Sequence, residues 1–134
     1  MKKNKILLLE DNPIHREVMV DGLEDAGYEI RKAQNIETAE KILEEFTPDL
    51  FLLDIVIETI RSAGIQFAQT VRNKPEYQSI PILFISAHLD DVNIIKYFPS
   101  DSDESKLLKP YDILAKPLDF DQLINKIREV LKEQ

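Results

Sequence analysis

Short apolar runs alternate with longer stretches of helical period along this chain, and this alternation restricts the fold more than any other feature. The apolar runs predict strands, because strands are short, whereas the longer stretches repeat apolar residues at three- and four-residue spacing, as amphipathic helices do. Strands that alternate with helices favour a parallel sheet covered on both faces. We predict strands over residues 5–9, 28–32, 49–53, 81–85 and 110–114. The predicted fold class is therefore α/β, with a doubly wound five-stranded parallel sheet.

The helices are predicted from their apolar stripes and from the residues at their ends. Asn12 followed by Pro13 marks the start of the first helix, and Gly27 marks its end. Asp119 is the expected N-cap of the last helix, and a further helix is expected over 89–98. The residues expected to be buried are Val18, Met19, Leu23 and Ala26 in the first helix; Ile36, Ala39, Leu43 and Phe46 in the second, which stops before Pro48; Ile65, Ala68 and Val71 in the third, over 63–72; and Phe120, Leu123, Ile124, Ile127, Val130 and Leu131 in the last.

The composition excludes several classes of function. A length of 134 residues suits a single domain, 1–134, and 43% hydrophobic with 31% charged residues is typical of a globular protein. The apolar runs are too short to cross a bilayer and no signal peptide is evident, so we expect a cytoplasmic protein without membrane insertion. The chain has no cysteine, which excludes disulfides and thiol chemistry. Its net charge of -8 opposes contact with nucleic-acid phosphates, so direct DNA binding is not expected.

Five polar residues end four of the predicted strands. Glu10 and Asp11 follow the first strand, Asp54 follows the third, and Ser86 and Lys116 follow the fourth and fifth. Carboxyl ends of parallel strands meet at one edge of the sheet, where open α/β sheets bind their ligands. The sequence therefore predicts that these five residues form one site.

The chemistry of this set favours phosphoryl transfer with a metal. Three clustered carboxylates repel one another unless a cation lies between them, and Mg²⁺ accepts carboxylates while sharing its remaining positions with water and phosphate. Asp54 would then be the nucleophile that forms an acyl phosphate. The Lys116 ammonium and the Ser86 hydroxyl would stabilise charge on the transferred group.

Each residue also has a plainer interpretation. Asp54 could cap the segment that follows it, and Asp11 could accept hydrogen bonds from the first backbone amides of the next helix. Lys116 could be a solvated charge. The combination of five such residues at four strand ends favours the functional interpretation. The two histidines, His15 and His88, are expected to have ordinary surface or packing roles.

The five site residues lie in four short motifs, Leu9-Glu10-Asp11-Asn12-Pro13, Leu52-Leu53-Asp54, Ile85-Ser86-Ala87-His88 and Ala115-Lys116-Pro117-Leu118. Through these motifs the chain resembles the response-regulator receiver domains of two-component signalling over essentially its whole length. The resemblance implies a flavodoxin-like strand order, 2-1-3-4-5, and a domain that catalyses only its own phosphorylation and dephosphorylation. It also implies a histidine kinase or histidine phosphotransfer protein as phosphodonor and a downstream effector protein as partner.

The resemblance assigns roles to the site residues. It implies that Glu10 and Asp11 hold Mg²⁺ together with Asp54, which accepts the phosphoryl group. By the same resemblance Ser86 and Lys116 contact that group. It further implies that the metal receives the backbone carbonyl of the residue two after the phosphoacceptor, here Val56, and that the bond before Pro117 is cis.

Three departures from the family pattern affect the expected output. Ile57-Glu58 replaces the usual Met-Pro pair, the segment between Ser86 and Lys116 is longer than usual, and Ile113 stands where an aromatic residue is common. We therefore expect the signal to leave through residues 88–111 and the adjoining last helix. A receiver-fold binding module that works without phosphorylation stays an alternative. An aspartate-based phosphatase fits poorly, because such enzymes need a second acid at position 56.

Overall fold

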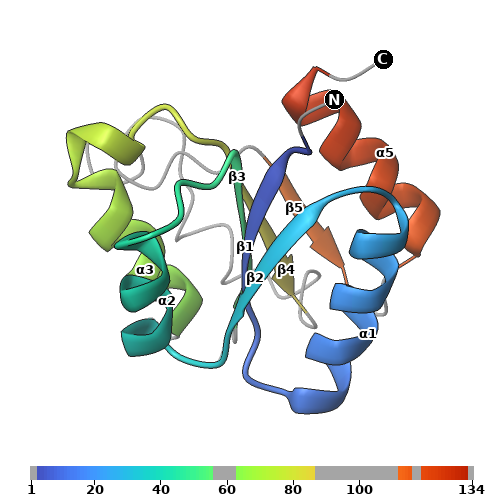
Figure 1. The fold of residues 1–134 in the computed structure, drawn as a ribbon, viewed down its shortest axis with the longest axis horizontal. Helices are drawn as coiled ribbons and strands as arrows, with labels where there is room; N and C mark the ends of the chain where they lie inside the picture. Colours follow the sequence, from blue (N-terminus) through green and yellow to red (C-terminus); the bar gives the residue numbers. More distant parts are fainter. Residues whose placement is uncertain (1–2, 56–62, 87–111, 116–118, 133–134) are drawn as a thin grey trace.

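A computed structural model describes residues 3–55, 63–86, 112–115 and 119–132. Five parallel strands form one sheet in the order β2-β1-β3-β4-β5, which confirms the predicted fold class and strand order (Figure 1). In this order β3 is the central strand, β1 and β4 flank it, and β2 and β5 form the two edges. The strands are β1 Lys5–Leu9, β2 Glu29–Ala33, β3 Leu50–Ile55, β4 Ile82–Ser86 and β5 Asp112–Ala115.

Helices cover both faces of this sheet. The α1 and α5 helices pack on one face, and α2 and α3 pack on the other (Figure 1). Within the described ranges, no helix is both long and apolar enough to span a membrane. The helix expected over 89–98 lies outside the described residues. The helices are α1 Pro13–Asp25, α2 Ile36–Leu43, α3 Ala63–Arg72 and α5 Phe120–Leu131, with a short 3₁₀ helix η1 at Pro75–Tyr77.

Two hydrophobic cores result from the alternation of side chains along the central strands. In β1, Ile6 and Leu8 pack against α1 and α5, whereas Leu7 and Leu9 pack toward α2 and α3. All four are buried, as expected of a parallel strand that is covered on both faces. The continuous apolar runs of the sequence therefore correspond to strands that have no solvent-facing side.

The predicted helix ends are confirmed by the capping contacts. Asn12 is the N-cap of α1, where its Oδ1 accepts from the Ile14 and His15 amides at 2.9 and 3.0 Å. Asp119 caps α5 in the same way. Gly27 follows the C-cap of α1 with φ +101°, a conformation that side chains with a Cβ rarely adopt.

One burial prediction in α1 was wrong. Val18 is 54% exposed, whereas Met19, Val20 and Leu23 are the buried residues of the helix. Each helical position rotates the side chain by about 100°, so Val18 points well away from Met19 and out of the apolar stripe. Ala26, which was also expected to be buried, is only partly buried and packs against the same core.

The first strand was predicted at its observed bounds, 5–9, whereas the bounds of the other predicted strands were one or two residues early. Strands β2, β3 and β4 each begin one residue later than expected, and β5 is described from Asp112. The important difference is at the end of β3, where pairing with β4 continues through Ile55 opposite Ser86. Asp54 therefore lies inside the paired strand rather than after it. The second helix also ends earlier than expected, at Leu43, and Phe46 is buried beyond it.

We predict that Gly27→Ala lowers the free energy of unfolding by about 1–2 kcal/mol, the usual cost of a Cβ in a left-handed conformation. A Cβ at this position meets no atom within 4 Å, so strain of the backbone alone would account for the loss. Urea unfolding followed by circular dichroism measures it. Gly27→Asn is the matched variant and should lose less, because asparagine adopts positive φ more readily. Equal stability of Gly27→Ala and the native protein would contradict this account.

Candidate site at the carboxyl edge of the sheet

Strand pairing brings the acidic residues together. Leu9 at the end of β1 is the register partner of Leu53 in β3, so the next residues, Glu10 and Asp54, are neighbours across the sheet. The amide of Glu10 donates to the carbonyl of Ala33 at 3.0 Å, which extends the pairing of β1 with β2 by one step. The backbone that presents Glu10 is therefore held by β2 and directly follows the residue that pairs with β3.

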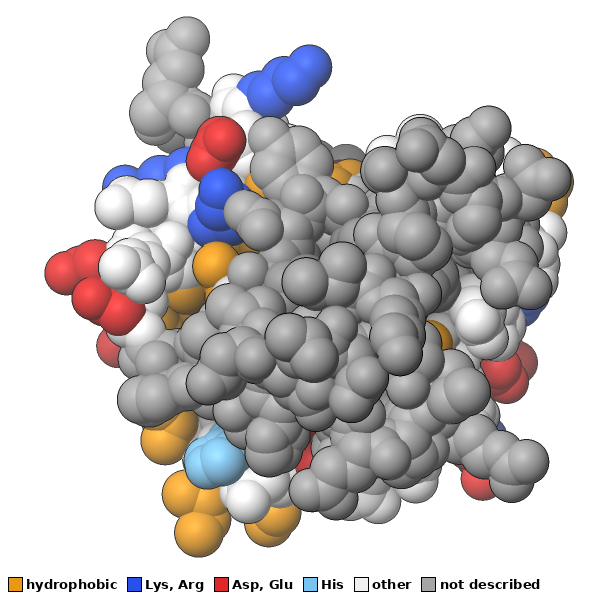
Figure 2. Space-filling model, turned by 180° about the vertical axis from the view of Figure 1, so that it is seen from behind, with side chains coloured by type: hydrophobic (Ala, Val, Ile, Leu, Met, Phe, Trp, Pro, Cys, Tyr) orange, Lys and Arg blue, Asp and Glu red, His pale blue; other side chains and the backbone are white. Residues whose placement is uncertain are grey.

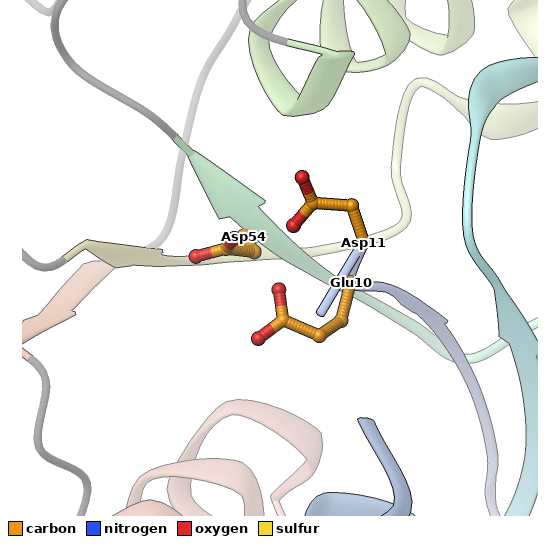
Figure 3. Close-up of side chains that lie close together, drawn as sticks. All are labelled: Glu10, Asp11 and Asp54. Atoms are coloured by element: carbon orange, nitrogen blue, oxygen red, sulfur yellow. The ribbon is translucent and has the colours of Figure 1, made fainter. Parts of the chain in front are cut away.

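The three carboxylates form a compact cluster. One carboxylate oxygen from each of Glu10, Asp11 and Asp54 lies within 4.8 Å of the others. Figure 3 shows their side chains gathered at the ends of β1 and β3. Glu10 is buried, Asp54 is partly buried and Asp11 is exposed, so the cluster opens to solvent on the side of Asp11. Oxygen atoms at such spacing are the ligands that hard divalent cations such as Mg²⁺ prefer.

The first turn of α1 contacts Glu10 from two residues. The His15 Nδ1 atom lies 3.4 Å from Glu10 Oε1, with the histidine side chain 53% exposed and the glutamate side chain fully buried. The Arg16 guanidinium donates from Nη1 to the Glu10 carbonyl at 3.0 Å. Glu10 is therefore held by the sheet through its amide and by α1 through its carbonyl and carboxylate.

The remaining predicted site residues are described only in part. The backbone of Ser86 ends β4 beside Ile55 and Ala115, which places it at the same edge of the sheet as Asp54. The side chain of Ser86 lies outside the described residues, as do Lys116 and Val56 entirely. Other predictions also fall outside the described residues: the cis bond before Pro117, the role of His88, the altered segment after Asp54 at 56–62 and the output segment 88–111.

Sequence reasoning missed the contacts that His15 and Arg16 make with Glu10. Side chains in a helix lean toward its N-terminus, so residues in the first turns can reach the loop before the helix. The sequence did contain a signal for these contacts. His15 and Arg16 follow the acidic pair within six residues, and α1 begins shortly after that pair. His15 was expected to have an ordinary surface or packing role, but it also contacts the acidic cluster through Glu10.

The surface of α1 beside the cluster is partly apolar. Ile14 is 74% exposed and Val18 is 54% exposed, and their spacing of one helical turn puts them on the same side of α1. Figure 2 shows hydrophobic side chains next to a histidine at the lower margin of the molecule. Two exposed aliphatic residues on a short helix form a small apolar surface near the site.

The family model for the response regulator receiver domain matches residues 6–128, which include every residue of the acidic cluster. The chain belongs to this family. Receiver domains are the signalling modules of two-component systems and are not enzymes in the usual sense.

The relatives are response regulators that carry more sequence than this chain. The chain is 28% identical to the phosphate regulon transcriptional regulatory protein PhoB of Pseudomonas aeruginosa, over 95% of this chain and 51% of that protein. It is 30% identical to the response regulator Rre1 of Synechocystis sp., over 96% of this chain and 52% of the relative. The chain thus spans about half the length of these relatives.

Solved structures agree with the fold. The chemotaxis response regulator CheY4 of Vibrio cholerae has a TM-score of 0.75 at 23% identity, over 96% of this chain and 99% of that chain. A signal receiver domain of a histidine kinase from Syntrophus aciditrophicus has a TM-score of 0.78 at 21% identity, over 96% of this chain and 90% of that chain. At these identities the likeness establishes the shared fold.

We predict that Asp11→Asn raises the free energy of unfolding of the metal-free protein by about 1 kcal/mol, because it removes one charge from a cluster of carboxylates whose oxygens lie within 4.8 Å of one another. Urea unfolding in the presence of a chelator measures the change. Asp21→Asn is the control, since Asp21 is an exposed acid on α1 outside the cluster. A gain that is no larger for Asp11→Asn than for Asp21→Asn would show that repulsion within the cluster is negligible.

Proposed function

We propose that this chain is a phosphoryl-accepting receiver domain in which Asp54 is the phosphoacceptor. The observation that supports this most is the clustering of Glu10, Asp11 and Asp54 within 4.8 Å at the carboxyl edge of a five-stranded parallel sheet. Asp54 is the member that belongs to a central strand, so its position is the most rigid of the three. We also propose that residues 1–134 form one domain, since both cores share the same sheet.

The residues of the cluster fit Mg²⁺. Glu10 and Asp11 would hold the ion together with Asp54, and the backbone carbonyl of Val56 is proposed as a further ligand. A buried carboxylate beside two others is costly unless a cation compensates it, which supports a metal at this position. When bound, the ion would neutralise charge on the carboxylates and on the phosphoryl oxygens.

The proposed reaction transfers a phosphoryl group from a phosphohistidine. A carboxylate oxygen of Asp54 forms a bond to phosphorus as the P–N bond breaks, and the imidazole nitrogen keeps the electron pair and takes up a proton. Hydrolysis later returns the carboxylate and releases inorganic phosphate when water attacks the phosphorus. Lys116 and Ser86 are proposed to contact the phosphoryl oxygens, where an ammonium and a hydroxyl would stabilise the charge that develops.

The proposed partners are a phosphodonor protein and an effector protein. The donor would be a histidine kinase or a histidine phosphotransfer protein, because the proposed reaction takes the phosphoryl group from a phosphohistidine. Ile14 and Val18 are exposed on the helix that begins beside the cluster, so we propose that they contact the donor. Direct DNA binding by this chain is not proposed, because its net charge of -8 opposes contact with phosphates.

We predict that the native chain gains about 80 Da, the mass of one phosphoryl group, when incubated with Mg²⁺ and a small-molecule phosphodonor, and that Asp54→Asn does not. Intact-protein mass spectrometry measures the gain. Asp49→Asn is the matched control, because Asp49 precedes the same strand at its opposite end and pairs with the Lys5 amide at 2.8 Å. Labelling that persists in Asp54→Asn would identify another acceptor, and absence of labelling in the native chain would favour the phosphorylation-independent binding module.

We also predict that Asp11→Ala weakens Mg²⁺ binding by more than about tenfold, because even residues that only orient ligands change metal affinity by about ten- to a hundredfold when replaced. Isothermal titration calorimetry or NMR titration with Mg²⁺ measures the affinity. Asp21→Ala, an exposed acid of α1, controls for the loss of one negative charge from the surface. Equal affinity of Asp11→Ala and Asp21→Ala would remove Asp11 from the proposed ligands.

A further inference from the structure

Arg16 binds the main chain of the acidic pair. Its Nη1 atom donates to the Glu10 carbonyl at 3.0 Å and makes a longer contact with the Asp11 carbonyl at 3.5 Å. Arg16 is the fourth residue of α1, so its side chain extends backward over the N-terminus of the helix to the loop before it. The guanidinium therefore links α1 to the two consecutive residues that contribute carboxylates to the cluster.

These hydrogen bonds are formed with carbonyl oxygens, so they do not depend on the charge of the carboxylates. A cation that paired with the carboxylates themselves would compete with a metal for the same oxygen atoms. A guanidinium that binds the carbonyls can hold the loop both before and after a metal binds. The Asn12 cap and the His15 contact with Glu10 restrain the same short segment from the same helix.

We propose that Arg16 is a positioning residue of the cation site: it fixes the main chain of Glu10 and Asp11 so that their carboxylates stay beside Asp54. This inference rests on the proposed function, because it assumes that the cluster binds a divalent cation. Without Arg16, the exposed residue Asp11 would be the least restrained of the three, since neither strand pairing nor burial holds its side chain.

The alternative is that Arg16 acts only through its charge, and the two possibilities predict opposite results. A positive charge beside the site repels Mg²⁺, so its removal should tighten binding if charge alone matters. If positioning matters, removal should weaken binding. Both contacts are made by the single Nη1 atom, so lysine, which keeps the charge but carries its nitrogen on a stem of different length and geometry, separates the two effects.

The test is an NMR titration of the ¹⁵N-labelled chain, residues 1–134, with Mg²⁺ alone, for the native protein, Arg16→Met and Arg16→Lys. We expect Arg16→Met to weaken binding about tenfold and Arg16→Lys to restore part of the loss. Arg128→Met is the matched control, because Arg128 is an exposed arginine in the last turn of α5 and should leave the affinity unchanged. Unchanged or tighter binding by Arg16→Met would overturn the inference, even if the variant were less stable.

A second measurement does not need the metal. Amide hydrogen exchange of residues 10–12 in the metal-free protein should be faster in Arg16→Met than in Arg128→Met, because the loop loses its anchor to α1. Equal exchange in the two variants would overturn the positioning role. If the native chain does not bind Mg²⁺, the proposed function is contradicted. If the native chain binds Mg²⁺ and Arg16→Met binds it equally well, only the role of Arg16 is contradicted.

Discussion

The parallel pairing of β1 with β3 is the interaction on which the site and both cores depend. Its register sets Leu9 opposite Leu53 and so places Glu10 beside Asp54. Because side chains alternate along a strand, a shift of one residue would turn every side chain of β1 to the other face of the sheet. Ile6 and Leu8 would then leave the core under α1 and α5, and the apolar packing therefore enforces the same register that assembles the acidic cluster.

The cluster concentrates negative charge at the ends of the most completely buried strands. Glu10 is buried and its carboxylate lies near those of Asp11 and Asp54, an arrangement that destabilises the metal-free protein. Apolar burial on both faces of the sheet offsets this cost, since the strands that end at the site are the most completely buried elements. The N-terminal turns of α1 add contacts that restrain Glu10, and the site is therefore held by a sheet edge and a helix terminus together.

Much of the fold could be predicted from local patterns. The third helix was placed at its observed bounds, 63–72, and the Asn12 and Asp119 caps were identified, because capping and apolar spacing are properties of neighbouring residues. Predictions failed where a longer-range contact decides the outcome. Val18 is apolar but faces solvent, since the position of the sheet relative to α1 buries Val20, with the predicted Met19 and Leu23, instead.

The sequence by itself determined the alternation of strands and helices and the residue types at the strand ends, because both follow from side-chain chemistry and spacing along the chain. Only the tertiary structure decided that Asp54 lies inside β3, since pairing with β4 continues through Ile55. It also decided that His15 and Arg16 contact Glu10. Those contacts depend on the angle at which α1 leaves the sheet, and packing of the helix on the core sets that angle through residues far apart in the sequence.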